Sequence, residues 1–305
     1  MKQGWIVPDW PAPASVHALV TTRAGGVSVA PYACLNLGDH VGDDPIAVAA
    51  NRRMLQTSLP TEPVWLKQVH GRGIADADHA AGVPNGHGKS VTPDHETCRD
   101  RFPHPSPPPA PARGVPAGIG SKAAQSGETG EGDEGSLRES QITADGSVAR
   151  KSGVVCAVLT ADCLPVLLCD RAGTVVAAAH AGWRGLADGV VEAAVAAMAV
   201  EAGEVLAWLG PAIGPQAFEV GGEVRQIFME HDPAADSAFV PSVNAGKWLA
   251  DIYLLARQRL ARIGVSAVYG GDCCTYSDAE RFYSYRRDGV TGRIASLVWI
   301  DPEKR

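Results

Sequence analysis

Two histidines and one cysteine combine residue type and position in a way that could bind a metal ion. His70 follows the run VWLKQV, His180 follows TVVAAA, and Cys163 lies in the turn ADCLP between two further apolar runs. Functional side chains of α/β proteins concentrate where strands end and loops begin. Imidazole nitrogen and thiolate sulfur suit Zn²⁺, and three protein ligands leave a fourth position for water or substrate. The three residues therefore predict a catalytic zinc site.

Two other interpretations of the same residues remain open at this point. No CxxC or HExxH motif supports the metal, so a buried cysteine and two hydrogen-bonded histidines are a plain structural alternative. A second alternative is a nucleophile pair in which Cys163 attacks and His70 or His180 acts as the base. Zinc has one advantage, because a dication stabilises a thiolate much more than a neutral imidazole does.

Short apolar runs predict the strands that would position these residues. They cover 64–69, 154–160, 164–169, 174–179, 205–209 and 294–300,. An Ala- and Val-rich segment, 186–202, and an amphipathic segment, 248–263, predict helices that end at Gly203 and Gly264,. The alternation of strands and helices indicates an α/β protein with a substantial mixed sheet.

One segment differs from the rest in composition. Residues 84–141 contain few large apolar side chains, and 101–120 alone contains seven prolines. Such a segment cannot bury enough surface to offset the entropy of ordering it, so 82–142 is predicted to be a disordered insertion. His87, His95, Cys98 and His104 fall within it and are interpreted as solvated loop residues. Since closing a long loop costs little more than closing a shorter one, we predict a single catalytic domain over 1–305.

Charge and cysteine usage restrict the class of protein. A formal net charge of −7 lacks the basic footprint of a nucleic-acid-binding protein,. No apolar run approaches the roughly 20 residues that cross a bilayer, and the start MKQGWIVPDW is no signal peptide,. Seven cysteines, an odd number without an export signal, argue against a disulfide framework,. We therefore expect a cytoplasmic protein that acts on small molecules, without nucleic-acid or membrane partners.

Several long strings, in order, resemble the YfiH family: TTRAGGVS, LNLGDHVGDD, WLKQVHG, LTADCLPVLL, AAHAGWRG, WLGPAIGP and CTYSDAERFYSYRRDGVTGR. The family was first termed "multicopper polyphenol oxidase, laccase-like", and its members are now regarded as purine nucleoside phosphorylases with adenosine deaminase side activity. The resemblance covers roughly 15–80 and 143–300. It implies a layered α/β/β/α fold similar to the catalytic domain of the cytotoxic necrotizing factors, which are cysteine–histidine deamidases.

The resemblance also implies roles for individual residues. The family's two histidines and one cysteine fall on His70, Cys163 and His180, which implies a zinc-centred pocket. One departure lies at 144–149, where this chain reads ADGSVA and the family usually has a stretch like ADALVT. The implied reaction is phosphorolysis of adenosine, inosine, guanosine or methylthioadenosine to a base and a sugar 1-phosphate. Deamination of adenosine would use a water whose pKa zinc lowers toward ~7.

Residues in the matching motifs are candidates for substrate handling. Three cations are predicted to hold phosphate and stabilise developing charge: Arg23, Lys67 and Arg184,. Asn36 and Gln68 are predicted to bond the base or ribose. Asp162 is predicted to orient a ligand histidine or to act as acid or base. Each has a structural alternative, such as capping a turn or bonding backbone amides.

Glycines and cysteines near these motifs complete the expectations. Gly182 and Gly185 are predicted to allow close backbone approach near the site. Cys274 is interpreted as structural, and GWRG does not match a dinucleotide-binding motif,.

Three rival functions follow from the same residues. A blue-copper site would add a nearby axial methionine, but none of the four methionines lies in a ligand motif,. A metal-free cysteine hydrolase or deamidase would use the same Cys/His set. A scaffold that recruits partners through the Pro-rich segment would leave that set unexplained.

Overall fold

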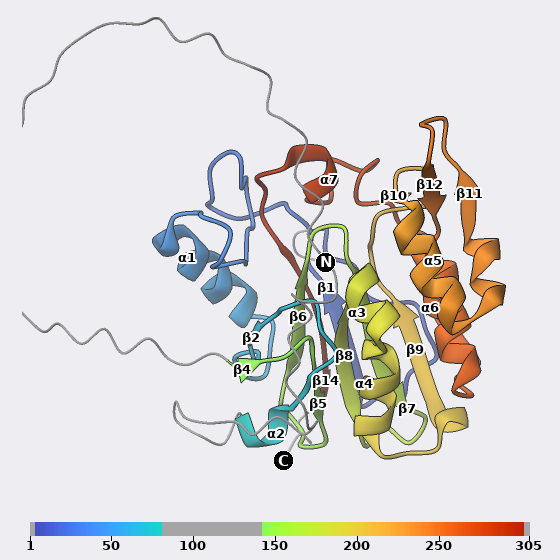
Figure 1. Cartoon of the computed structure of the whole chain (residues 1–305). Coiled ribbons are helices and arrows are strands. Elements are labelled where there is room, and N and C mark those ends of the chain that lie inside the picture. Colours follow the sequence, from blue (N-terminus) through green and yellow to red (C-terminus); the bar gives the residue numbers. More distant parts are fainter. Residues whose placement is uncertain (1–3, 81–141, 302–305) are drawn as a thin grey trace, which may run out of the picture.

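The computed structural model describes residues 4–80 and 142–301 of the 305-residue chain (Figure 1). The insertion predicted over 82–142 lies outside the described residues, except for its last residue. Ile142 forms the short strand β4 (Ile142–Thr143), which pairs in parallel with β2 (Leu66–Lys67). The described chain therefore resumes as ordered structure one residue earlier than expected.

A mixed six-stranded sheet forms the centre of the molecule. Its strand order is β13 (Ala267–Gly270), β9 (Val205–Leu209), β7 (Leu164–Asp170), β8 (Val176–Ala181), β5 (Gly146–Ala149) and β3 (Ile74–Asp76). The two outer pairs are parallel, and the inner pairs are antiparallel. Every residue of β7, β8 and β9 is buried, which explains why these strands are apolar without alternation,.

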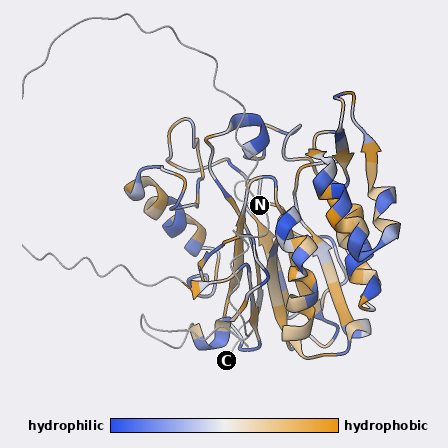
Figure 2. Cartoon of the chain, viewed as in Figure 1, coloured by the Kyte–Doolittle hydropathy of each residue, from blue (hydrophilic) through white to orange (hydrophobic). Residues whose placement is uncertain are grey.

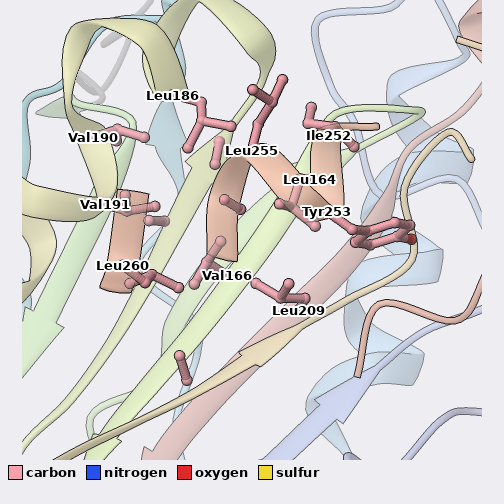
Figure 3. Close-up of a cluster of buried hydrophobic side chains, with 14 of the residues drawn as sticks. Leu164, Val166, Leu186, Val190, Val191, Leu209, Ile252, Tyr253, Leu255 and Leu260 are labelled. Carbon is pink, nitrogen blue, oxygen red and sulfur yellow. The ribbon is translucent and has the colours of Figure 1, made fainter. Parts of the chain in front are cut away.

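Helices cover one face of this sheet. These are α3 (Trp183–Asp188), α4 (Val190–Met198), α5 (Gly222–His231) and α6 (Ile252–Arg262). Figure 3 shows side chains of α4 and α6, such as Val190 and Leu260, in one buried cluster with Val166 and Leu209 of the sheet. A small sheet of β10 (Glu219–Gly221), β12 (Lys247–Ala250) and β11 (Phe239–Pro241) lies beside α5.

A second sheet packs on the other face. It is antiparallel, with the order β1 (Val16–Val20), β14 (Ile294–Ile300) and β6 (Cys156–Thr160). Val158 and Val298 share one core with Leu167 and Trp208 of the central sheet. Leu55 of α1 (Pro45–Gln56) covers the far side of the second sheet. The layers are therefore α/β/β/α, as expected, and Figure 2 shows the apolar strands at their centre.

The two predicted helices have different bounds in the structure. The segment 186–202 holds the end of α3 and all of α4, because Gly189 takes a left-handed conformation with φ of 96° and ends α3,. α4 ends at Met198, before the left-handed Ala199, so the predicted end at Gly203 is wrong. In the segment 248–263 the first residues belong to β12. The helix α6 starts only after Asp251, whose carboxylate accepts a hydrogen bond from the Leu254 amide,.

The predicted strands agree better with the structure. β9 and β14 have the expected bounds. β8 extends to Ala181, so His180 lies within the strand instead of after it. The run 64–69 forms only a two-residue strand at Leu66–Lys67. Two short helices, α2 (Ala77–Ala80) and α7 (Tyr285–Asp288), complete the fold. Among the described helices, none combines the length and apolar character needed to cross a bilayer.

Candidate metal centre

The structure brings His70, Cys163 and His180 together. One ligand atom from each lies within 4.8 Å of the others. The Cys163 Sγ is 3.9 Å from the His70 Nε2. The two imidazole rings meet edge to face, with centroids 4.7 Å apart and an interplanar angle of 70°. Residues from separate parts of the chain thus form one cluster, which we call the His–Cys–His cluster.

The register of the central sheet places two members of the cluster. β7 and β8 are antiparallel neighbours, and Pro165 pairs with His180. Cys163 immediately precedes β7, so its side chain comes close to that of His180. The turn before Cys163 contains Asp162 in a left-handed conformation with φ of 87°. The antiparallel pairing of β7 and β8 therefore brings Cys163, in a turn, close to His180, inside β8.

The third member lies in a turn that one carboxylate holds. Asp145, fully buried, accepts hydrogen bonds from the amides of Val69, His70 and Gly71, the last two at 2.8 and 2.7 Å. His70 itself has a left-handed φ of 62°. A non-glycine residue in this region costs free energy, and the three amide contacts help to offset that cost.

The same carboxylate orients the second histidine. Asp145 Oδ1 lies 2.9 Å from His180 Nδ1, and the Asp145 carbonyl accepts from the His180 amide at 2.6 Å. A proton on Nδ1 shared with the carboxylate leaves Nε2 as the ligand atom. Sequence reasoning did not select Asp145. A signal was present, because Asp145 is a residue of the ADGSVA stretch that is shared with the ADALVT of the family.

One separation within the cluster is close to the value in a tetrahedral zinc site. Zn–N and Zn–S bonds of about 2.1 and 2.3 Å place the two ligand atoms about 3.6 Å apart at a tetrahedral angle. The observed separation of Cys163 Sγ and His70 Nε2, 3.9 Å, is close to that value. Two imidazoles, one thiolate and a carboxylate behind one imidazole could therefore bind a metal ion,.

The electrostatics of the cluster favour its charged forms. Burial opposes ionisation of the Cys163 thiol, but the His180 ring and hydrogen bonds from both histidines outweigh it and lower the pKa to about 6. Burial also opposes protonation of His180. The Cys163 thiolate and the Asp145 carboxylate outweigh that effect and raise its pKa to about 10. Without a metal, the two side chains therefore form a thiolate–imidazolium pair.

Two glycines let α3 begin against the cluster, as predicted. A Cβ on Gly182 would lie 2.8 Å from Cys163 Sγ and 3.2 Å from His70 Cδ2. A Cβ on Gly185 would lie 2.8 Å from the Gly71 carbonyl oxygen. Real Cβ atoms are not found so close to other atoms, so larger residues would displace the cluster or the helix.

Asn36 and Gln68 have their side chains bonded within the protein. Asn36 is fully buried, and its Oδ1 accepts from the amides of Gly38 and Arg293. The side-chain amide of Gln68 exchanges two hydrogen bonds with the backbone of Leu159. Both side chains therefore connect segments of the fold, and their contact with base or ribose stays a prediction.

The three predicted phosphate cations differ in their surroundings. Arg23 donates from Nε and both terminal nitrogens to the carbonyls of Ala33 and Ala279. Lys67 is exposed on β2. Arg184 lies in α3, two residues after Gly182, with its guanidinium carbon 4.3 Å from the centroid of the Trp183 ring. Each of the three nitrogens of the Arg23 guanidinium therefore donates to a carbonyl of the fold.

The carboxylate of Asp162 bonds to residues of the segment 275–286. Its carboxylate accepts from the Thr275 hydroxyl at 2.6 Å, the Ser284 hydroxyl at 3.0 Å and the Arg286 amide at 2.7 Å. These hydrogen bonds connect residues 275–286 to the turn before Cys163. The carboxylate that contacts a histidine of the cluster is that of Asp145.

Comparison with known proteins identifies the family. A family model described as multi-copper polyphenol oxidoreductase laccase matches residues 17–98 and 120–301. The purine nucleoside phosphorylase PA4543 of Pseudomonas aeruginosa is 49% identical over 296 residues, covering 97% of this chain and 98% of that protein. The purine nucleoside phosphorylase YfiH of Escherichia coli is 47% identical over 297 residues, with the same coverage.

Solved structures show the same relationship. The Neisseria meningitidis protein NMB0706 is 43% identical with a TM-score of 0.76, covering 98% of this chain and 99% of that chain. YlmD from Geobacillus stearothermophilus is 27% identical with a TM-score of 0.75, covering 99% and 98%. With its His–Cys–His cluster, its layered fold and these near full-length matches, the chain belongs to the YfiH family, whose model carries the description multi-copper polyphenol oxidoreductase laccase.

Proposed function

We propose that this protein is a zinc-dependent purine nucleoside phosphorylase that also deaminates adenosine. The observation that carries the proposal is the His–Cys–His cluster, with Asp145 behind His180. Relatives that align over nearly the whole chain bear the name purine nucleoside phosphorylase, which supports the reaction class. The substrates are adenosine, inosine, guanosine and methylthioadenosine, and the compartment is the cytoplasm.

The reaction assigns different tasks to the residues around the cluster. His70, Cys163 and His180 would hold the zinc, which supplies positive charge and lowers the pKa of a water molecule. In phosphorolysis a phosphate oxygen bonds to C1′ of the ribose while the bond from C1′ to the purine nitrogen breaks. A positioned cation stabilises the phosphate and the charge that moves onto the purine. We assign this task to Arg184, because α3 starts against the cluster. Lys67 is the second candidate.

A metal-free cysteine hydrolase is the second candidate function. The observation in its favour is the lowered pKa of Cys163, because a thiolate at neutral pH is a nucleophile,. The two functions differ in what removal of metal does. A hydrolase that uses the thiolate works in metal-stripped protein, whereas the proposed phosphorylase does not.

Metal analysis and a product assay test the proposal together. Purified protein should carry about one zinc per chain, and not copper. Adenosine with phosphate should give adenine and ribose 1-phosphate, and without phosphate only slower formation of inosine should remain. Cys163→Ala should lose bound zinc and activity together, whereas Cys34→Ala, at an exposed cysteine outside the cluster, should keep both. Full activity in thoroughly metal-stripped protein would favour the hydrolase.

Arg184→Lys tests the assignment of the phosphate cation. Lysine keeps the charge but loses the planar fork of the guanidinium, so a bidentate phosphate contact is lost. Phosphorolysis should fall by about 10²–10³. The zinc content should stay the same, because arginine is not a ligand. Normal phosphorolysis in this variant would show that the phosphate is bound by other residues.

A further inference from the structure

A second arginine reaches the site from the other sheet. Arg293 immediately precedes β14, whose first residue, Ile294, pairs with Thr160 at the end of β6. The chain continues from Thr160 directly into the turn that carries Asp162 and Cys163. The antiparallel register therefore places Arg293 beside this turn, at the end of the second sheet where the His–Cys–His cluster lies.

The backbone and side chain of Arg293 are held in place. Its amide donates to Asn36 Oδ1 at 2.8 Å, and its carbonyl accepts from the Leu37 amide at 3.2 Å. The side chain runs against Gly38, where a Cβ would lie only 2.8 Å from the Arg293 Cγ. Buried Asn36 and the absence of a side chain at Gly38 thus define the path of this arginine.

One edge of the guanidinium is anchored. Nη1 donates to the carbonyls of Thr291 and Gly292, at 3.0 and 2.9 Å. Within the part of the chain that the structure describes, Nε and Nη2 make no such hydrogen bond. This distinguishes Arg293 from Arg23, in which all three nitrogens donate to carbonyls. Two parallel N–H groups on one edge match two oxygens of a phosphate.

The guanidinium of Arg293 lies near charged groups of the His–Cys–His cluster and of the turn before it. Burial lowers the pKa of its guanidinium, whereas the nearby Cys163 thiolate and Asp162 carboxylate act in the opposite direction. An arginine stays protonated in spite of such burial. The carboxylate of Asp162 is already occupied by Thr275, Ser284 and Arg286. The positive charge of Arg293 is therefore not neutralised by a direct carboxylate partner among the described residues.

We propose that Arg293 binds the phosphate substrate, with its Nε and Nη2 edge directed at two phosphate oxygens. The inference rests on the proposed phosphorolysis. It adds Arg293 to the three cations that the sequence motifs predict for phosphate binding. Arg184 comes from α3 on the central sheet, and Arg293 from the start of β14 on the second sheet. Phosphate bound by both would be held between segments from the two halves of the fold.

Steady-state kinetics with varied phosphate test this proposal. In Arg293→Lys and Arg293→Met, the KM for phosphate in inosine phosphorolysis should rise by about 10–100-fold, the usual effect of losing a charged hydrogen bond. The KM for inosine should change by less than about 3-fold, within the usual scatter of single contacts. Arg150→Met is the control. Arg150 also donates to backbone carbonyls, of Ala197 and Met198, but follows β5 at the end of the sheet away from Asp145.

The outcomes separate this inference from the proposed function. If the unaltered protein releases no purine in a phosphate-dependent reaction, the proposed function fails and the inference fails with it. If the unaltered protein is active and Arg293→Lys keeps its KM for phosphate, only the inference is overturned. The same holds if the KM for inosine rises as much as that for phosphate. Zinc content and the thermal unfolding midpoint identify any variant that misfolds. If Arg293→Met does not fold, the KM for phosphate of Arg293→Lys decides the test.

Discussion

At the scale of single residues, one buried carboxylate organises the candidate metal centre. Asp145 contacts the backbone of the His70 turn and the side chain of His180. A buried carboxylate is costly unless hydrogen bonds surround it, and here amide donors and an imidazole satisfy both oxygens,. The charge that orients His180 therefore also holds His70 in its left-handed conformation.

The first prediction concerns this carboxylate. Asp145→Asn should lower zinc affinity by about 10–100-fold, because the amide no longer orients the imidazole as the charge does. Competition with a coloured chelator measures the affinity. The matched control is Asp170→Asn, since Asp170 is also buried and accepts from the Thr174 and Val175 amides at the opposite end of β7. Both variants should be less stable, but only Asp145→Asn should bind zinc more weakly. Equal zinc affinity in the two variants would contradict the role of Asp145.

At the scale of elements, the junction between β8 and α3 decides how closely a helix approaches the cluster. β8 ends at Ala181 and α3 starts at Trp183, with Gly182 as the N-cap between them. The φ of Gly182 is −58°, so other residues could adopt this backbone conformation. Glycine is required here by space, because the cluster occupies the position that a Cβ would take,.

The second prediction follows from that space. Gly182→Ala should lower zinc affinity strongly, because the new methyl group must displace Cys163 Sγ or the His70 ring,. Gly203→Ala is the control, since nothing lies within 4 Å of the Cβ that it would add. The control should stay within about 0.5 kcal/mol of the original stability and bind zinc normally. Normal zinc binding by Gly182→Ala would mean that the cluster relaxes without losing its ligands.

At the scale of the whole molecule, the described residues form a layered core. The central sheet has α4 and α6 on one face and the second sheet on the other. The segment 81–141 connects α2 to β4, and its contribution to stability stays a prediction from composition.

The third prediction is that this segment is dispensable for folding. Replacing 82–141 by a short Gly/Ser linker, and keeping Ile142 because it pairs with Leu66, should leave the unfolding transition largely intact,. Denaturant unfolding with and without the replacement measures the midpoint and the slope. Zinc content should also be retained. A large loss of cooperativity would show that the segment packs on the core.

The sequence by itself determined the residue types of the His–Cys–His cluster and several of the strands near it. Apolar runs are local, so β9 and β14 were predicted with the bounds that the structure has. Ligand chemistry is also local, and His70, Cys163 and His180 were selected by residue type, position and family resemblance. The layered α/β/β/α fold came from the resemblance alone, because strand periodicity does not say which strands pair.

Only the tertiary structure decided which polar side chains serve the fold and which face the site. The sequence does not show that Asn36 bonds the Arg293 amide, or that Gln68 bonds the Leu159 backbone, because these partners are distant in the chain. Asp145 and Asp162 are both buried aspartates near the cluster, and only their hydrogen bonds show that Asp145 is the one that contacts His180. The physical reason is that a hydrogen bond needs a partner at a defined distance and angle. For Asp145 and Asp162 these partners lie on segments distant in the chain, which only the tertiary structure brings together,.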